Sequence, residues 1–165
     1  MPSPVFIICG PTATGKSDLA LEVARKYNGE IINADSMQLY KGMDIGTAKL
    51  TVAERQGIPH HLLDILDVSQ DASVASYQGL ARAAVDQLRA DGKAAVIVGG
   101  TGLYIKAIID EMNFPETDPA LRKQLEDEAE LLGTAELYSR LRVLDPEAAD
   151  AIEPANTRRI IRALE

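Results

Sequence analysis

The residues best suited to chemistry lie between positions 10 and 17, where a glycine-rich stretch joins a predicted strand to a predicted helix. Gly10, Gly15, Lys16 and Ser17 have the spacing G-x-x-x-x-G-K-[ST] of a phosphate-binding loop. The glycines let backbone N–H groups point into one concavity, the helix presents its positive end to an anion, and the lysine adds a mobile charge. The Ser17 hydroxyl suits the Mg²⁺ that accompanies phosphate groups. We therefore predict a diphosphate or polyphosphate site made by Gly10, Pro11, Thr12, Ala13, Thr14, Gly15, Lys16 and Ser17.

The elements that must position this loop follow from the apolar pattern of the first 113 residues. The predicted strands are 5–9, 30–34 and 94–98, with an extended segment at 61–66, and the predicted helices are 16–27, 76–90 and 103–112, with a short one near 52–56. Strands alternating with helices indicate an α/β fold, a P-loop NTPase-like parallel sheet with helices on both faces. We expect strands 5–9 and 94–98 to be buried. Loops that follow parallel strands meet at one edge, so segments 35–40 and 99–102 should lie beside the phosphate loop.

Two features of these loops bear on the reaction. Asp35 follows the second strand, where a carboxylate is suited to act as a general base or to hold a metal through water, and equally suited to cap a turn. Strand 94–98 is followed by Gly99-Gly100-Thr101, where a P-loop ATPase would carry a metal-holding acid. This difference favours group transfer to a flat or bulky second substrate over ATP hydrolysis.

The character of the chain changes after Asn113. Pro115 and Pro119 bracket a predicted linker, and helical patterns follow at 119–132, 134–144 and 156–165, with Asp118 and Asn156 as N-cap residues. We therefore expect a P-loop core at 1–113, an all-helical insertion at 114–155, and the start of a helix that returns to the core at 156–165.

Composition sets limits on the class of protein. The 165 residues are 46% hydrophobic and carry a net charge of −8, which argues against a surface that binds nucleic acid along its whole extent and leaves room for a local basic patch. A single cysteine excludes an intrachain disulfide. We find no signal segment and no apolar run of membrane-spanning length, and we expect a cytoplasmic monomer without membrane contact.

Three sequence runs carry a resemblance to a known family. GPTATGKS at 10–17, NADSMQLYKGMDIGTAK at 33–49 and VGGTGLY at 98–104 resemble the tRNA dimethylallyltransferases, also called tRNA isopentenyltransferases. PHHLLD at 59–64, DPALR at 118–122 and RRIIRALE at 158–165 match the same family in order. The resemblance extends over the whole chain.

The resemblance implies a reaction and roles for particular residues. The family transfers the dimethylallyl group of dimethylallyl diphosphate to the exocyclic amine of the adenosine 3′ of the anticodon in tRNA. The phosphate loop, with Lys16 and Mg²⁺ at Ser17, would then hold the diphosphate leaving group rather than ATP. By the same resemblance Asp35 is the general base, Thr101 orients the base being modified, and the tRNA side of the channel is lined by Asp35, Ser36, Met37, Gln38 and Thr101.

Four arginines match tRNA contacts of the family. Arg122 lies in the helical insertion, and Arg158, Arg159 and Arg162 lie in the last helical pattern. Arg158 and Arg162 are one turn apart, which suits contact with phosphates of the anticodon stem-loop. Without the family, charged residues of this kind most often form a solvated helix face.

Members of the family continue well beyond the position of Glu165, with a part that returns to the core and adds an arginine near the diphosphate. We accordingly expect this chain by itself to bind diphosphate and to turn over poorly or not at all. Two alternatives stay open: a P-loop small-molecule kinase or AMP-prenylating relative, which would need no arginine surface for tRNA, and a diphosphate- or nucleotide-binding fragment without activity.

Overall fold

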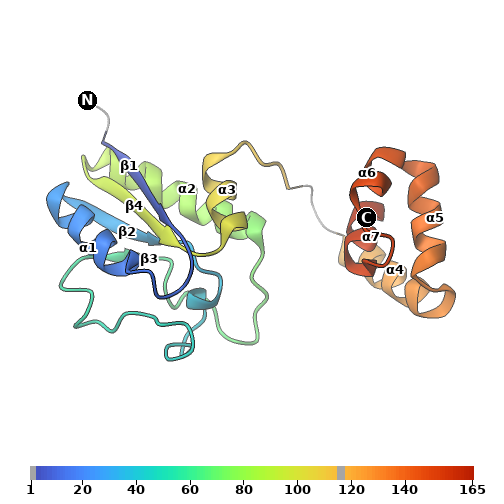
Figure 1. The fold of residues 1–165 in the computed structure, drawn as a ribbon, viewed down its shortest axis with the longest axis horizontal. Coiled ribbons are helices and arrows are strands. Elements are labelled where there is room, and N and C mark those ends of the chain that lie inside the picture. Colours follow the sequence, from blue (N-terminus) through green and yellow to red (C-terminus); the bar gives the residue numbers. More distant parts are fainter. Residues whose placement is uncertain (1–2, 115–117) are drawn as a thin grey trace. The chain divides into compact units, whose positions relative to one another are not determined.

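The computed structural model describes residues 3–114 and 118–165, which belong to two compact units, residues 1–113 and 114–165 (Figure 1). The linker predicted between Pro115 and Pro119 lies for the most part outside the described residues. None of the helices in the described ranges combines the length and the apolar character needed to cross a membrane.

The first unit is an α/β unit. Its elements are β1 (Val5–Cys9), α1 (Lys16–Lys26), β2 (Gly29–Asn33), a 3₁₀ turn (Met37–Leu39), β3 (His60–His61), α2 (Val74–Ala90), β4 (Ala94–Gly99) and α3 (Gly102–Ile109). All pairings are parallel, and the strand order is β1-β4-β2-β3. The carboxyl ends of β1, β2 and β4 therefore lie at one edge of the sheet, as expected for a site built from the loops that follow them.

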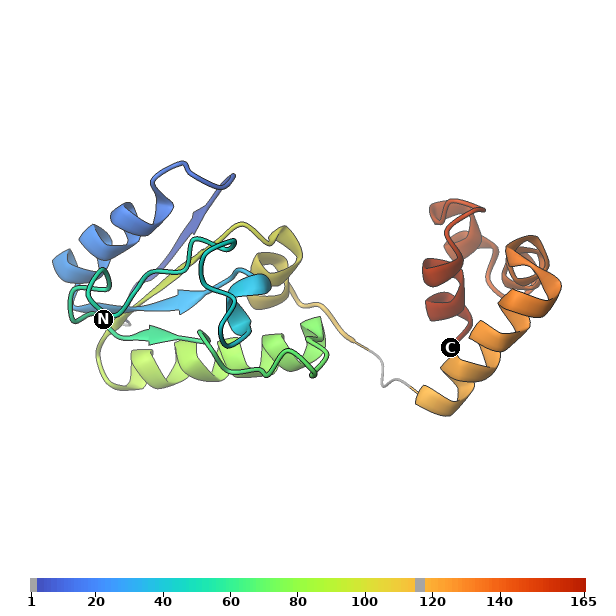
Figure 2. The same ribbon diagram turned by 90° about the horizontal axis from the view of Figure 1, so that it is seen from below.

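Helices cover both faces of this sheet, with α1 on one side and α2 and α3 on the other (Figures 1 and 2). Alternate side chains of a strand point to opposite faces, so Ile31 packs with α1 whereas Ile32 packs with α2. Both isoleucines are fully buried, and each contributes about 2 kcal/mol to stability by leaving water. The α/β architecture predicted from the alternation of strands and helices is confirmed.

Some local predictions differ from the structure. Strand β1 lies at the edge of the sheet. Phe6 and Ile8 pack towards α1, whereas Val5, which points to the opposite face of the sheet, is 40% exposed. The prediction that strand 5–9 is buried is therefore wrong for the face that carries Val5. The short helix expected near 52–56 is a series of turns. The third strand is limited to His60–His61, followed by an isolated bridge between Tyr40 and Leu66.

The second unit is all helical, with α4 (Pro119–Leu132), α5 (Thr134–Leu144), α6 (Pro146–Ala151) and α7 (Thr157–Leu164). Its core contains Leu125, Leu137, Leu141, Ala149, Ile160 and Ile161. The carboxylate of Asp118 accepts hydrogen bonds from the backbone N–H groups of Ala120 and Leu121, as predicted for an N-cap. Helix α6 was not predicted, although Asp145 followed by Pro146 is a helix-start signal.

Residues 156–165 differ from the expectation of a helix that returns to the α/β core. Helix α7 packs within the helical unit, where Ile160 is fully buried and the hydroxyl of Thr157 is hydrogen-bonded to that of Thr134 at 2.6 Å. The physical reason is the apolar stripe of α7, which is buried against α4 and α5. The predicted N-cap is present, since the Asn156 side chain accepts a hydrogen bond from the N–H of Arg159.

Candidate active site

The phosphate loop connects the end of β1 to the start of α1, as the sequence predicts. Gly15 precedes the first helical residue with φ of 77°, in the left-handed region that favours glycine. Inside the loop, the Thr14 hydroxyl donates to the carbonyl of Pro11 at 2.9 Å, and the Lys16 ammonium donates to the same carbonyl. Residues 11–15 are exposed, so the loop and the start of α1 are accessible to an anion.

Asp35 is held in a turn at the end of β2. Its backbone N–H donates to the side-chain oxygen of Asn33 at 3.0 Å, and the Asn33 amide donates back to the Asp35 carbonyl at 2.9 Å. The Oδ1 atom of Asp35 accepts the N–H of Met37 at 3.0 Å, which starts the 3₁₀ turn. The carboxylate therefore has the turn-capping contact that we weighed as an alternative to a chemical role, and that contact fixes its orientation.

The loop after β4 is joined to the Asp35 turn. The backbone N–H of Ser36 donates to the Thr101 hydroxyl oxygen at 3.1 Å, and the N–H of Thr101 donates to the carbonyl of Ala34 at 3.2 Å. These contacts place Thr101 beside Asp35–Ser36, although 65 positions separate Thr101 from Ser36 in the sequence. The structure thus brings these three predicted site residues together.

The glycines after β4 serve the packing of loops as well as access for a substrate. A Cβ atom at Gly99 would lie 2.2 Å from the carbonyl carbon and oxygen of Ala34, so only glycine fits where β4 passes the end of β2. A Cβ atom at Gly100 would lie 3.5 Å from the carbonyl oxygen of Gly10. Gly100 therefore lies next to the start of the phosphate loop. We predicted that these glycines leave space for a flat or bulky substrate. At Gly99 the space is instead filled by the backbone of Ala34.

A small cavity connects the phosphate loop to the turn that follows Asp35. It is lined by Ser17, Ala20, Ile31, Asn33, Gln38, Ala48, Leu50, His60, Leu63 and Val98. Ser17, at the start of α1, and Gln38, in the 3₁₀ turn, share this cavity, whereas Met37 is exposed. Thr101 contacts Ser36, and Gly100 lies next to Gly10. The three loops that we predicted to meet at one edge of the sheet therefore do meet there.

Comparison with known proteins shows the family to which the chain belongs. The family model described as IPP transferase matches residues 38–165. The chain belongs to the IPP transferase family. It is 59% identical over 165 residues to a tRNA dimethylallyltransferase of Streptomyces coelicolor, a match that covers 99% of this chain and 53% of that protein. The chain thus spans about half the length of the curated relatives it matches.

Two solved structures extend the comparison to the fold of the IPP transferases. The tRNA isopentenylpyrophosphate transferase of Bacillus halodurans is 45% identical, with a TM-score of 0.67, over 99% of this chain and 55% of that one. A eukaryotic dimethylallyltransferase, described as acting on tRNA, is 30% identical, with a TM-score of 0.84, over 98% of this chain and 40% of that one.

The four arginines predicted for tRNA contact lie in the helical unit of this IPP transferase chain. Arg122 and Arg162 both bind Oε2 of Glu165, at 2.8 and 2.9 Å, and the Glu165 side chain is 1% exposed. Hydrogen bonding by Arg122, helped by Arg162 and opposed by burial, lowers the pKa of Glu165. The side chains of Arg122 and Arg162 are each more than a third exposed, and Arg158 and Arg159 are exposed on α7. The structure therefore brings two of the four arginines onto one carboxylate.

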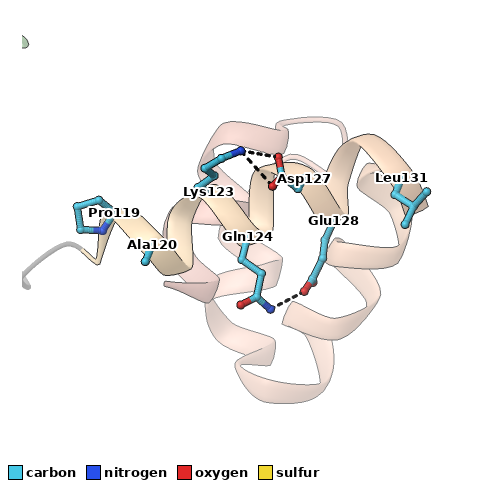
Figure 3. Close-up of a pocket in the computed structure, with 7 residues that line it drawn as sticks. All are labelled: Pro119, Ala120, Lys123, Gln124, Asp127, Glu128 and Leu131. Atoms are coloured by element: carbon cyan, nitrogen blue, oxygen red, sulfur yellow. Dashed lines mark hydrogen bonds and ion pairs between the residues drawn. The ribbon is translucent and has the colours of Figure 1, made fainter.

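A different surface of α4 forms an open hollow (Figure 3). It is lined by Pro119, Ala120, Lys123, Gln124, Asp127, Glu128 and Leu131. Lys123 pairs with Asp127 at 3.1 Å, and the Gln124 amide donates to Glu128 at 2.8 Å, so the polar groups of this surface bind one another along the helix. None of the four predicted arginines lines it.

Sequence reasoning missed two residues that support the site. Asn33 is buried and bonds to both Asp35 and the carbonyl of Leu62. Tyr77, on α2, donates its hydroxyl to the carbonyl of Asn33 at 2.8 Å, and it stacks on Tyr104 of α3 with ring centroids 3.9 Å apart. An amide at the end of an apolar strand was a usable signal for Asn33, because a buried polar group needs partners. Nothing local marked Tyr77.

Proposed function

We propose that this chain provides the diphosphate site, the catalytic carboxylate and part of the RNA-binding surface of a tRNA dimethylallyltransferase. The observation that carries the proposal is the junction of three loops: a phosphate loop next to Gly100, and Asp35–Ser36 bonded to Thr101. The relatives named tRNA dimethylallyltransferase support it through identities near 58% over the whole of this chain.

The phosphate loop is proposed to stabilise the leaving group. The bond between the allylic carbon and the diphosphate oxygen breaks, and its electron pair leaves with the diphosphate. The loop N–H groups, the positive end of α1 and the Lys16 ammonium are suited to stabilise that developing charge. Lys16 would exchange its contact with the Pro11 carbonyl for one with a phosphate oxygen.

Mg²⁺ fits this site with Ser17 as its protein ligand. The ion usually binds through few protein atoms together with waters and phosphate oxygens, and Ser17 is half-buried at the start of α1. No group of three or more acidic, histidine or cysteine side chains suited to a metal occurs within the described residues, which favours binding together with the diphosphate. When bound, the ion adds positive charge beside the leaving group.

Asp35 is proposed to accept the proton of the acceptor amine. The new bond forms between the exocyclic nitrogen of adenine and the allylic carbon, and the nitrogen loses a proton to the carboxylate. Met37 occupies Oδ1, while Oδ2 accepts no hydrogen bond from the described residues. Adenine would have to leave its stack to reach this carboxylate, and Ser36 and Thr101, which are bonded to each other beside Asp35, are its proposed contacts.

The helical unit is proposed to contact tRNA phosphates through Arg122, Arg158, Arg159 and Arg162. Arg122 and Arg162 would then share their charge between Glu165 and a phosphate group. A tRNA substrate modified 3′ of the anticodon would suit a cytoplasmic protein, and this location stays a prediction.

The test is transfer of labelled dimethylallyl from its diphosphate to an adenosine-bearing anticodon stem-loop, at low salt with Mg²⁺. Asp35→Asn keeps an oxygen for the N–H of Met37 and removes the base, so we expect about a 100-fold or greater loss without loss of stability. Asp67→Asn, at an exposed ion pair of the same unit, is the matched control. AMP and ATP as competing substrates separate the kinase and AMP-prenylating alternatives.

Each outcome has a distinct meaning. Transfer by Asp35→Asn within about threefold of the wild type would contradict the role of Asp35, because removal of a general base costs at least about 100-fold. No transfer by the wild type, with Mg²⁺-dependent binding of inorganic diphosphate, would reject activity of this chain alone and keep the phosphate site. Absence of that binding would reject the phosphate site itself.

A further inference from the structure

A buried lysine anchors the loop between β2 and β3. The side chain of Lys49 is 2% exposed, and its ammonium contacts Asp64 Oδ1 at 2.6 Å, the Tyr40 carbonyl at 2.7 Å and Asp44 Oδ1 at 2.9 Å. An ammonium has three donors, so its hydrogen-bonding capacity is filled. Two of the acceptors, on Tyr40 and Asp44, lie in this loop and the third, Asp64, follows β3, so Lys49 ties the loop to the segment after β3.

The charges around Lys49 are balanced. Burial acts to lower the pKa of Lys49, but the hydrogen bonds and charges of Asp64 and Asp44 outweigh it and hold that pKa above its ordinary value. Arg55 adds a second cation 3.8 Å from Asp64 Oδ2. Lys49 is thus charged at neutral pH, and its loss would remove the ion pair of Asp44 and leave Asp64 with Arg55.

Contacts lead from this lysine to the candidate active site. The backbone N–H of Asp64 donates to the carbonyl of Gln38 at 3.3 Å, and the Gln38 amide donates to the carbonyl of Thr47 at 2.9 Å. Two residues before Asp64, the carbonyl of Leu62 accepts the Asn33 amide that also binds Asp35. The segment 62–64, which Lys49 contacts through Asp64, is therefore hydrogen-bonded both to Gln38 and to Asn33, the residue that binds Asp35.

The backbone beside this cluster is strained. Ala48, Leu62 and Asp64 have φ of 51°, 61° and 56°, in the left-handed region that residues other than glycine adopt rarely. Such conformations persist where surrounding contacts impose them, and they gather at functional sites. Asp64 forms an ion pair with Lys49. Ala48 immediately precedes Lys49 in the chain, and it also lines the small cavity that contains Ser17. The Lys49 contacts thus lie next to two of these three positions, Ala48 and Asp64.

We propose that Lys49 is a positioning residue for the acceptor side of the transferase site: through Asp64 and Tyr40 it holds residues 36–38 in place beside Asp35. This inference rests on the proposed function. A complete buried ion pair adds little net stability over apolar packing of the same volume, so stability by itself is a weak reason for this cluster. The distinguishing feature is the path of contacts to Gln38 and Asn33.

The test compares Lys49→Met and the milder Asp64→Asn with Lys41→Met in this chain. Lys41 is the matched control, since it lies in the same loop as Lys49 and its ion pair with Asp67 is exposed on both sides. Amide hydrogen exchange is measured over residues 36–48 and over residues 5–26. Transfer kinetics give kcat, the KM for dimethylallyl diphosphate and the KM for the stem-loop.

We expect exchange over 36–48 to rise about tenfold or more in the Lys49 and Asp64 variants, with exchange over 5–26 unchanged. We expect kcat/KM for the stem-loop to fall about 100-fold while the KM for dimethylallyl diphosphate stays constant, because a misplaced loop affects orientation of the acceptor. Should Lys49→Met fail to fold, Asp64→Asn carries the comparison.

Three results would overturn the inference: unchanged exchange over 36–48, faster exchange without a loss of transfer, or a loss of transfer that comes from a higher KM for dimethylallyl diphosphate. If the wild type binds diphosphate and transfers nothing, as expected for this chain by itself, transfer kinetics give no readout, and the positioning inference is then decided by the exchange of residues 36–48 alone. Absence of diphosphate binding would instead reject the proposed function.

Discussion

Replacement of Gly99 by alanine tests how β4 positions the site. The added Cβ would lie 2.2 Å from backbone atoms of Ala34, and ordinary contact begins at 3.4 Å, so the two segments must separate by more than 1 Å. Backbone atoms at this position cannot rotate away as a side chain could. The same separation would stretch the 2.7 Å hydrogen bond from Ala34 N–H to the carbonyl of Val98 and the 3.2 Å bond from Thr101 N–H to the carbonyl of Ala34.

The magnitude follows from these contacts. Loss of the two hydrogen bonds costs about 2 kcal/mol, and overpacking adds about 1–3 kcal/mol. We therefore expect a loss of about 3–5 kcal/mol in the free energy of unfolding of the α/β unit, a large share of the 5–15 kcal/mol that is typical for a domain. Since Thr101 moves with Gly99, the contact between Thr101 and Ser36 should also weaken.

The assay is native-state hydrogen exchange of the β2 and β4 amides, because it reports on the α/β unit without a contribution from the helical unit. Gly100→Ala is the matched control, since its Cβ would meet only the Gly10 carbonyl oxygen, at an ordinary 3.5 Å. We expect the control to change stability by less than about 1 kcal/mol. Equal effects of the two substitutions would refute the close-approach argument, and so would full protection of β4 in Gly99→Ala.

Two further substitutions test the support of the sheet. Glu30 is buried and binds Lys93 and His61; burial raises its pKa, but these partners outweigh burial and hold the pKa below the ordinary 4.5. Its carboxylate therefore stabilises the fold above about pH 4.5, and this stabilisation is lost as pH falls through the lowered pKa. We expect Glu30→Gln to lower the free energy of unfolding, measured with urea, by about 2 kcal/mol at pH 7 and by progressively less below pH 4.5. A difference between variant and wild type that stays constant across this pH range would contradict a stabilising charge on Glu30. Tyr77→Phe removes the donor to the Asn33 carbonyl and should cost about 1–2 kcal/mol, measured by thermal unfolding, with the ring stack on α3 retained.

Local chemistry in the sequence determined much of this protein. The loop between β1 and α1 was predictable from strand 5–9, from Gly10 and Gly15, and from Lys16-Ser17. The reason is that turn conformation and suitability for an anion depend on adjacent residues. The start of α4 was predicted to the residue, since Asp118 and Pro119 supply the cap and the first turn. Alternating elements were enough to predict a parallel sheet covered on both faces.

The tertiary structure decided what depends on residues far apart in the chain. The order β1-β4-β2-β3 leaves β1 at the sheet edge, and no local pattern distinguishes an edge strand from a central one when both are apolar. Gly99 needs its small size because of Ala34, and Lys49 is charged and buried because of Asp64 and Asp44. Each of these roles belongs to a pair of groups brought together by folding. The sequence alone determines which residues can do chemistry, and folding determines which of them meet.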